Sequence, residues 1–342
     1  MLVIPINTYA YTDTSKSSIV MDMNSGRILY SKNPNDVRLI ASTTKIMTAI
    51  LAIENGNLKK QVIIGEEVLK MYGTNIYIEV GEQMSITDLL YGLLLRSGND
   101  ASVVIAKSVG GTEKNFVKMM NEKAIKLNMK NTTFKNPHGL DDDTKNYSTA
   151  YDMALLSTYA YKNKTYRKIS LTKKYEVSNG KKTYLWYNRN KFLNEYKYAT
   201  GGKNGYTPDA GKTLVTTARK DGLNITTVTL KDTNPYENHQ NIDNNIFKKY
   251  KKYTIVDKNN FHIDKNYFKG KLYLKDSFEY PLTEEEKDKI KTLVSITNKD
   301  KKTVGKVTIY LGKDIIGTVP IYQQKKEEKE NFFSKIKSLF TW

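Results

Sequence analysis

The chain has 342 residues, a formal net charge of +19 and no cysteine. Its length accommodates two domains, and a hydrophobic content of 39% excludes a wholly disordered chain. The missing cysteines exclude disulfides, thiol catalysis and cysteine-bound metals, and the isolated His138, His239 and His262 have no metal-ligand spacing. We therefore expect no metal or other cofactor.

The positive charge is compatible with a nucleic-acid partner, an anionic membrane or wall polymer, or simple lysine richness. The lysines are spread along the whole chain, and no recognition helix or zinc-finger pattern accompanies them. A nucleic-acid partner is therefore not expected. No stretch has the length and apolar character that a membrane-spanning helix needs.

The chain opens with the apolar residues 1–6, which lack a basic start. Residues 1–16 are interpreted as a leader or the remnant of a secretion signal, with a first strand as the alternative. Residues 17–23 and 27–30 then flank a turn at Gly26, a pattern that predicts a β-hairpin.

A buried helix is predicted next, because the residues from Ile46 to Ile53 are mostly apolar and Asn55-Gly56 is a stop signal. Ser42 and Lys45 are expected in its first turn, three residues apart and therefore on one face. A buried lysine has a lowered pKa and can accept the proton of a serine hydroxyl, while the helix N-terminus favours an oxyanion. This reasoning makes Ser42 the candidate nucleophile and Lys45 its base.

The S-x-x-K pattern is weak by itself. Ser170/Lys173, Ser178/Lys181 and Ser334/Lys337 also match it. Only the pair at 42 and 45 precedes a long apolar helix, and that context separates it from the other matches.

The middle of the chain reads as helical. Ser85 and Asp88 form a capping-box pattern before a leucine-rich run that breaks at residues 96–99. Further helices are expected from Asp100 to residue 110 and over residues 116–127, followed by a polar loop at 131–147. Thr149 and Asp152 form a second capping-box pattern ahead of another helix.

Beyond this helix the hydrophobic period changes to two. Residues 174–177 and 183–186, and residues 213–218 and 223–230, predict two hairpins with turns at Asn179-Gly180 and Asp221-Gly222. Strands at both ends with helices between them predict an α+β fold, in which an antiparallel sheet gathers both chain ends and carries a helical cluster.

The predicted organisation is a first domain over residues 17–240 and a small, mostly β domain over residues 250–323, with the asparagine-rich segment 231–250 as the boundary region. Glycine turns are expected in the β domain at Gly312 and Gly317. Residues 324–342 read as a charged spacer and an amphipathic tail, whose apolar residues share one helix face: Phe332, Phe333, Ile336, Leu339, Phe340 and Trp342. Its basic flanks predict binding to a membrane surface; packing on the β domain or a frayed end is the alternative.

Two further short motifs join Ser42 and Lys45. Ser97-Gly98-Asn99 is expected on a loop between two apolar helices, and Lys203-Asn204-Gly205 follows Gly201-Gly202. Each is common alone, and Ser31-Lys32-Asn33 is an unrelated match to the first. Their order and spacing after Ser42 and Lys45, however, resemble the active-site set of penicillin-binding proteins and class A β-lactamases.

Longer stretches of sequence resemble one family within this group. Residues 41–49, 90–100 and 137–140 are similar to the low-molecular-mass D-alanyl-D-alanine carboxypeptidases, and the similarity covers roughly residues 17–230. It implies a β-lactamase/transpeptidase-like fold and an enzyme located outside the cytoplasm, on the outer face of the bacterial cytoplasmic membrane. The implied partners are peptidoglycan stem peptides and β-lactam antibiotics.

The resemblance also implies roles for the motif residues. Ser42 would attack the penultimate D-alanine carbonyl, Lys45 would take its proton, and Ser97 and Asn99 would complete the proton path and hold the peptide. The substrate-binding residues would be Lys203, Asn204, Gly205, Tyr206 and Thr207, with the backbone N–H groups of Ser42 and Tyr206 as the oxyanion hole.

One position departs from the family, which usually has threonine where this chain has Asn204. The threonine hydroxyl donates to the substrate carboxylate, a role that the Asn204 amide or the Thr207 hydroxyl could assume. Activity is expected to survive with an altered substrate or β-lactam preference.

Two other functions compete with this interpretation. A class A β-lactamase needs a glutamate in a context like E-x-x-L-N, and the candidates Glu113, Glu122, Glu176 and Glu195 all lack it. The other is a non-catalytic penicillin-binding or wall-binding module, with Asn204 marking a decayed site.

Overall fold

The computed structural model describes residues 12–263, 271–297 and 302–324. Most of the expected leader and the whole tail from residue 325, with Ser334 and Lys337, lie outside these ranges. The chain forms two compact units, Met1–Lys248 and Lys249–Trp342, which are described separately.

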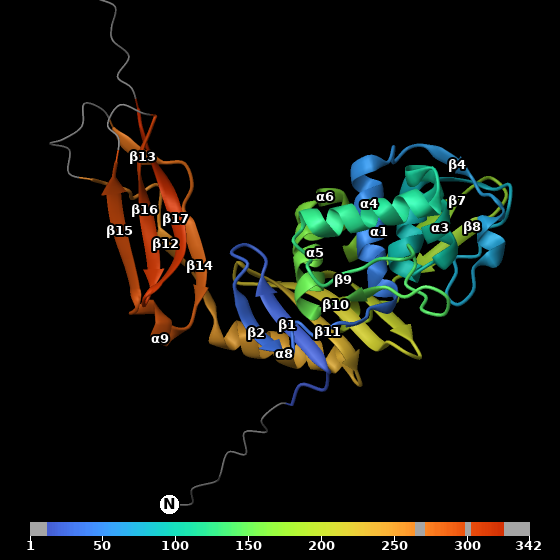
Figure 1. The fold of residues 1–342 in the computed structure, drawn as a ribbon, viewed down its shortest axis with the longest axis horizontal. Coiled ribbons are helices and arrows are strands. Elements are labelled where there is room, and N and C mark those ends of the chain that lie inside the picture. Colours follow the sequence, from blue (N-terminus) through green and yellow to red (C-terminus); the bar gives the residue numbers. More distant parts are fainter. Residues whose placement is uncertain (1–11, 264–270, 298–301, 325–342) are drawn as a thin grey trace, which may run out of the picture. The chain divides into compact units, whose positions relative to one another are not determined.

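A five-stranded sheet organises the first unit, with the strand order β2-β1-β11-β10-β9 and every neighbouring pair antiparallel (Figure 1). Strand β1, the first of this unit, pairs with β11, the last, so that Ser17 lies opposite Leu230. The predicted sheet that gathers both ends of the domain is therefore confirmed. The strands are β1 (Ser17–Asp22), β2 (Ile28–Lys32), β9 (Ala199–Thr207), β10 (Gly211–Lys220) and β11 (Leu223–Asp232).

The two faces of this sheet are covered by different helices. Val215 and Val228 belong to the core beneath the helical cluster, where helix α5 (Ala150–Lys162) packs on β1 and β11. Helix α8 (Pro235–Lys249) covers the other face (Figure 1). There the hydroxyl of Thr216 hydrogen-bonds His239 at 2.7 Å. Alternation along the strands thus places Val215 and Val228 on one face and Thr216, Thr227 and Thr229 on the other.

Residues 231–250, predicted as the boundary region, contain helix α8, which the sequence did not predict. Its polar, asparagine-rich sequence buries His239 and Asp243 against the sheet's threonines, with the Thr227 hydroxyl donating to Asp243 at 2.5 Å. Polar composition was a poor guide to this helix because its buried polar side chains bond threonines of the sheet. The division between the two units falls at its C-terminal end.

The helical cluster surrounds α1 (Lys45–Asn55), which is buried along its first eight residues. Ile46 and Ile50 of α1 and Leu89 of α2 are completely buried in the common core. The other helices and turns of the cluster are η2 (Glu66–Lys70), α2 (Ile86–Tyr91), η3 (Gly92–Arg96), α3 (Asn99–Gly110), α4 (Glu113–Lys126), α6 (Lys164–Leu171) and α7 (Phe192–Glu195). Short two-stranded ladders join β3 (Arg38–Leu39) to β6 (Tyr147–Ser148), β4 (Gln61–Ile63) to β5 (Gln83–Ser85), and β7 (Lys174–Ser178) to β8 (Thr183–Tyr187).

The two predicted capping boxes differ in outcome. Ser85 and Asp88 exchange both side-chain-to-backbone bonds, so the first is confirmed. The Thr149 hydroxyl accepts from the Asp152 N–H, but the Asp152 carboxylate accepts from the Asn131 N–H and the Thr132 hydroxyl. The second box is thus only half formed, because its acid ties down the preceding loop instead.

The second unit is the predicted small β domain. One ladder pairs β12 (Lys251–Val256) with β14 (Phe278–Leu282), and a four-stranded sheet has the order β13-β17-β16-β15. Its strands are β13 (Leu272–Leu274), β15 (Ile290–Ile296), β16 (Thr303–Leu311) and β17 (Asp314–Gln323), with the short helix α9 at Glu284–Lys287.

Of the two glycine turns expected there, only Gly312 is one, with φ +63°. Gly317 lies within β17 opposite Ile309, where a Cβ atom would overlap the ring of Phe278. This glycine serves ring packing and not chain reversal. Across the part of the chain that the structure describes, no helix is both long and apolar enough to traverse a bilayer.

Candidate active site

Ser42 lies on a tight turn that leads into α1. Residues Ala41–Thr44 form the 3₁₀ turn η1, and the α-helix begins at Lys45, one turn later than the sequence predicted. Side chains three residues apart eclipse each other in a 3₁₀ turn. The Lys45 Nζ accordingly lies 3.0 Å from the Ser42 Oγ, with Lys45 fully buried and Ser42 half-buried.

The Lys45 Nζ has three hydrogen-bond partners among the described residues. Besides Ser42 Oγ, they are the Asn99 Oδ1 at 2.7 Å and the His138 carbonyl oxygen at 2.6 Å. Asn99 presents its oxygen to the amine, since its Nδ2 donates to the Tyr72 carbonyl at 2.7 Å. A neutral amine has two N–H donors and one lone pair. Two carbonyl-type acceptors occupy both donors, so the lone pair of a neutral Lys45 faces the serine hydroxyl.

The surroundings favour that neutral form. Burial, followed by the positive charge of Lys203, holds the pKa of Lys45 well below its ordinary value, against a smaller opposing effect of Asp100. Burial and then the charge of Arg189 lower the pKa of Lys203 to about 7. His138 contributes its carbonyl to this cluster, and burial followed by Lys45 lowers the pKa of its ring to about 3.

A loop that includes Pro137-His138-Gly139 packs against the serine turn, η1. Gly139 has φ +88°, and a Cβ atom there would overlap the Ala41 carbonyl oxygen and lie 3.0 Å from the Ser42 nitrogen. Only glycine suits both the backbone conformation and this approach. The side chain of Asn136 accepts from the N–H groups of His138 and Gly139, which fixes the loop against the turn.

The second motif joins the site where two helices meet. The π-helical turn η3 ends at Ser97, a buried residue in the left-handed conformation with φ +67°, and α3 begins at Asn99. The neighbouring Asp100 carboxylate accepts from the backbone N–H groups of Ile76 and Tyr77. This anchor holds the start of α3, and with it Asn99, in place beside Lys45.

The third motif approaches from the edge of the sheet. Lys203, Asn204 and Gly205 lie on β9, an edge strand paired only with β10. Lys203 is buried, and its Nζ donates to the Asn204 carbonyl at 2.6 Å. A Cβ atom at Gly205 would lie 2.8 Å from the Ser42 nitrogen, so the strand backbone rests directly on the serine turn.

The two residues after this motif behave differently. Tyr206 is 64% exposed, whereas Thr207 is buried and its hydroxyl donates to the Asp141 carboxylate at 2.5 Å. Since a hydroxyl has one proton, Thr207 is not free to donate to a substrate carboxylate. That part of the expectation is not supported by the geometry, and Asn204, which is half-buried, is the remaining candidate.

Three groups that contribute to the site were not predicted from the sequence. Arg189, whose side chain donates to the Thr74 hydroxyl at 3.1 Å, carried no signal because it stands alone between β8 and α7. Asp141 belonged to a conspicuous acidic run, and its contact with Thr207 depends on chain folding. The His138 carbonyl is a backbone group, which a sequence pattern rarely identifies. In the described ranges, no three His, Asp or Glu side chains gather in a way that could hold a metal ion.

The protein has an antiparallel sheet that carries a helical cluster, and a buried lysine amine contacts a serine hydroxyl. These features define the class of serine acyl-transfer enzymes that use lysine as the base. A family model described as D-alanyl-D-alanine carboxypeptidase matches residues 6–234. The chain therefore belongs to the D-alanyl-D-alanine carboxypeptidase family, and the resemblance inferred from the motifs is confirmed.

Individual relatives agree with this assignment. The chain is 35% identical over 254 residues to D-alanyl-D-alanine carboxypeptidase DacF of Bacillus subtilis (strain 168), an alignment that covers 72% of this chain and 65% of the relative. This chain thus spans slightly less than two thirds of that protein's length.

Solved structures show the same fold. Penicillin binding protein 5 from Haemophilus influenzae is 25% identical with a TM-score of 0.76, over 92% of this chain and 98% of that one. A variant of the Streptomyces K15 DD-transpeptidase is 30% identical with a TM-score of 0.67, over 70% of this chain and 99% of that one. The predicted transpeptidase-like fold is confirmed.

Proposed function

We propose that this protein is a serine D-Ala-D-Ala carboxypeptidase that removes the terminal D-alanine from peptidoglycan stem peptides. The observation that carries the proposal is the set of partners around the Lys45 Nζ. Two carbonyl-type oxygens, from Asn99 and His138, occupy its donors and leave the amine lone pair for Ser42. An amine arranged in this way is a general base for the hydroxyl that it faces.

In the first half of the reaction, the Ser42 Oγ attacks the carbonyl carbon of the penultimate D-alanine while its proton passes to Lys45. The backbone N–H groups of Ser42 and Tyr206 stabilise the resulting oxyanion. Support for the Tyr206 group comes from the position of β9, because an edge strand turns every second N–H away from its partner. Collapse of the intermediate breaks the peptide bond, and the released D-alanine nitrogen takes the proton back from Lys45 by way of Ser97.

In the second half, water attacks the acyl-enzyme ester with Lys45 again accepting a proton. The ester bond to Ser42 breaks, the hydroxyl is reprotonated, and the shortened stem peptide leaves. A β-lactam ring that opens on Ser42 gives an analogous ester, so the same hydroxyl is the expected site of acylation by penicillins.

The substrate's terminal carboxylate is bound by residues on and beside strand β9. Arg189 places positive charge beside Lys203, whose pKa is lowered to about 7 by burial and then by that charge. The half-buried Asn204 amide supplies an N–H donor in place of the family's threonine hydroxyl.

The proposal is tested by mass spectrometry after incubation with a labelled penicillin, followed by D-alanine release from a D-Ala-D-Ala pentapeptide. We expect one label on Ser42, loss of both reactions in Ser42→Ala, and wild-type behaviour of Ser178→Ala, which alters an unrelated S-x-x-K match on the β7 strand. A non-catalytic module would take up the label without releasing D-alanine. Label on another residue, or full activity of Ser42→Ala, would overturn the assignment.

A class A β-lactamase is less well supported. The partners of the Lys45 Nζ in the described structure are a hydroxyl, an amide and a backbone carbonyl, and none is a glutamate. Slow release of the penicillin label, with turnover of the pentapeptide, separates the peptidase from the lactamase.

We place the enzyme outside the cytoplasm, on the outer face of the bacterial cytoplasmic membrane, with residues 332–342 as its surface anchor. The apolar residues of this tail share one helix face, opposite its lysines, and this pattern supports the assignment. The full chain is expected to sediment with anionic lipid vesicles, whereas a chain ending at Gln324 should stay in the supernatant. Equal sedimentation of the two chains would refute the anchor.

A further inference from the structure

The first unit also has a cavity whose lining includes none of the residues of the serine turn η1. It has a volume of about 430 Å³ and is lined by Met23, Asn24, Thr158, Tyr161, Lys162, Arg167, Arg219 and Asn224. The lining contains three cationic side chains and no carboxylate. Its volume is within the range of pockets that hold small ligands.

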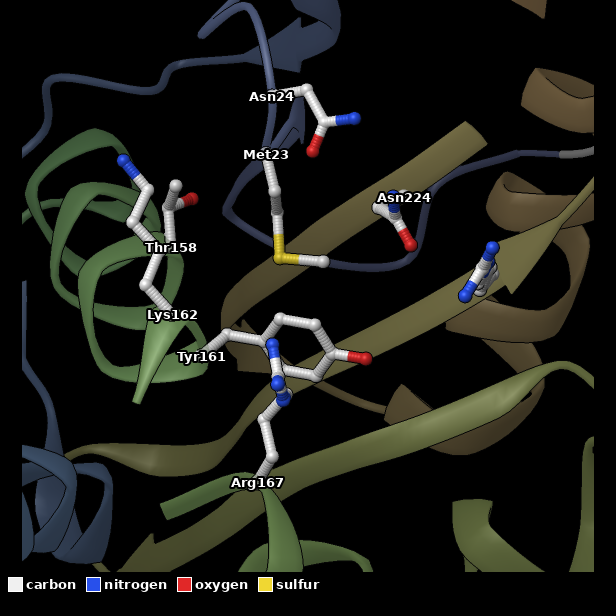
Figure 2. A pocket seen from close by; sticks show the side chains of 8 residues that line it. Met23, Asn24, Thr158, Tyr161, Lys162, Arg167 and Asn224 are labelled. Carbon is white, nitrogen blue, oxygen red and sulfur yellow. The ribbon is translucent and has the colours of Figure 1, made fainter. Parts of the chain in front are cut away.

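The cationic groups reach this cavity, here called the basic pocket, from three separate elements. Lys162 ends α5, Arg167 lies in α6, and Arg219 lies near the end of β10, opposite Asn224 of β11. Figure 2 shows Met23 and Arg167 pointing toward the ring of Tyr161 from opposite sides. The convergence is therefore a product of the fold and not of a local run of lysines.

These cations lack anionic partners within the described part of the chain. Other cations do pair with carboxylates, as Lys123 does with Glu54 at 2.6 Å and Lys107 with Glu67 at 2.8 Å. For Lys162, Arg167 and Arg219, by contrast, the described residues provide no carboxylate within ion-pair distance. Three like charges around one cavity repel one another, and a bound anion removes that repulsion.

The guanidinium of Arg167 is also held in position. Its Cζ lies 5.4 Å from the centre of the Tyr161 ring, a cation–π contact. The guanidinium carries five N–H donors that can bind a ligand.

The donor set is better matched by phosphate than by carboxylate. Two guanidinium groups, one ammonium and the carboxamides of Asn24 and Asn224 offer many N–H donors, more than the two oxygens of a carboxylate can use. A phosphate group presents three or four oxygens and up to two charges, and arginine binds it through paired N–H donors. The thioether of Met23 and the ring of Tyr161 add an apolar wall for an organic group attached to the phosphate.

We propose that the basic pocket is an anion site that binds the phosphate group of a small organic phosphate, such as a phosphorylated polyol, independently of the peptidase site. Binding brings the oxygens of the phosphate to Arg167, Arg219 and Lys162, with the organic part against Met23 and Tyr161.

The test measures binding of the full-length protein to inorganic phosphate, glycerol 3-phosphate and acetate by calorimetry at constant ionic strength. Vesicles of phosphatidylglycerol, with phosphatidylcholine as the neutral reference, test a lipid headgroup as the source of the phosphate. The variants are Arg167→Gln/Arg219→Gln, the milder Lys162→Gln at an exposed position, and Lys114→Gln/Lys126→Gln, which removes the same charge from exposed positions of α4. Unchanged penicillin acylation and circular dichroism verify that each variant is folded.

We expect both phosphates to bind more tightly than acetate, with about tenfold weaker binding after loss of the two arginines and no change in the α4 control. Binding to phosphatidylglycerol vesicles that depends on the arginines, without binding of the soluble phosphates, also supports the site and identifies a headgroup as its ligand. Equal loss in the α4 control, acetate binding as tight as phosphate, or no phosphate binding that depends on Arg167 and Arg219 overturns the proposal.

Discussion

At position 45 a lysine side chain is completely enclosed, and its three hydrogen-bond partners among the described residues are uncharged. Burial penalises the charged amine, and the charge of Lys203 adds to that penalty. The two lysines therefore form a coupled pair, in which Lys203 affects acylation through the proton affinity of Lys45. A positioning role for Lys203 can be separated from substrate binding by measuring the pH dependence of acylation.

Replacing Lys203 by methionine removes this charge while retaining a side chain of similar length. Lys45 then holds its proton more tightly, so the amine becomes neutral only at higher pH. We expect the acidic limb of the penicillin acylation rate to move to higher pH, and the rate at pH 7 to fall by about a hundredfold.

The measurement is the second-order acylation rate between pH 5 and pH 9. The exposed Lys212→Met on the neighbouring strand β10 is the control and should leave the profile as in the wild type. A limb that stays in place, or moves to lower pH, would contradict the coupling between the two lysines.

Asn204 is the other informative residue, because Thr207 already donates to Asp141. Asn204→Thr restores the family's usual hydroxyl and shortens the side chain. We expect a change of about three- to tenfold in kcat/KM for a D-Ala-D-Ala peptide, or in acylation by one class of β-lactam, as a single altered hydrogen bond implies. If neither kinetic parameter changes, this position does not contact the carboxylate.

At the scale of elements, the site depends on backbone segments that approach one another at glycine. The serine turn η1 is contacted by the loop at Gly139 and by β9 at Gly205, both close to the Ser42 nitrogen. A side chain at either glycine would push the turn away from Lys45 or from the edge strand. The loop and the strand can therefore approach the Ser42 nitrogen this closely only because neither glycine has a Cβ atom.

Gly139→Ala tests this directly. The substitution combines a positive φ with an overlap against the Ala41 carbonyl, so we expect a stability loss of about 2–4 kcal/mol and a drop in acylation rate of at least about a hundredfold. Chemical denaturation and penicillin acylation kinetics measure the two effects.

Gly180→Ala provides the matched control. Gly180 has φ +85° in the β7–β8 turn, with no atom within 4 Å of its added Cβ, so it carries the conformational cost without the overlap. It should lose about 1 kcal/mol of stability and no activity. Similar kinetics of the two variants would show that the serine turn tolerates displacement.

At the scale of the whole molecule, every residue proposed for catalysis or substrate binding belongs to the first unit. The K15 structure is matched over 99% of its own chain by 70% of this one, so a unit of about this size makes up nearly all of that structure.

A chain that ends at Lys248 should therefore remain folded and active on soluble substrates. We expect its penicillin acylation rate and its D-alanine release from a soluble pentapeptide to lie within about twofold of the full chain, since no described site contact is removed. A loss of more than about tenfold, in a truncated chain whose circular dichroism shows it to be folded, would demonstrate that the second unit supports the site.

Much of the fold could be predicted from patterns in the sequence. Periodicity identified the hairpins, the buried helix after Lys45 and the β-rich second unit, because local hydrophobic repeats reflect which face of an element is buried. It failed for α8, whose buried polar side chains bond threonines of the sheet, and for Gly317, whose role is to admit the ring of Phe278.

By itself the sequence determined the family and the identity of the motif residues, since their order along the chain is a linear property. Only the tertiary structure decided how the amine of Lys45 is oriented, through Asn99 and a backbone carbonyl from residues 54 and 93 positions away. The same holds for Arg189 beside Lys203, and for the basic pocket. Proton affinity and ligand selection depend on burial and on distances across the fold, and a residue pattern carries neither.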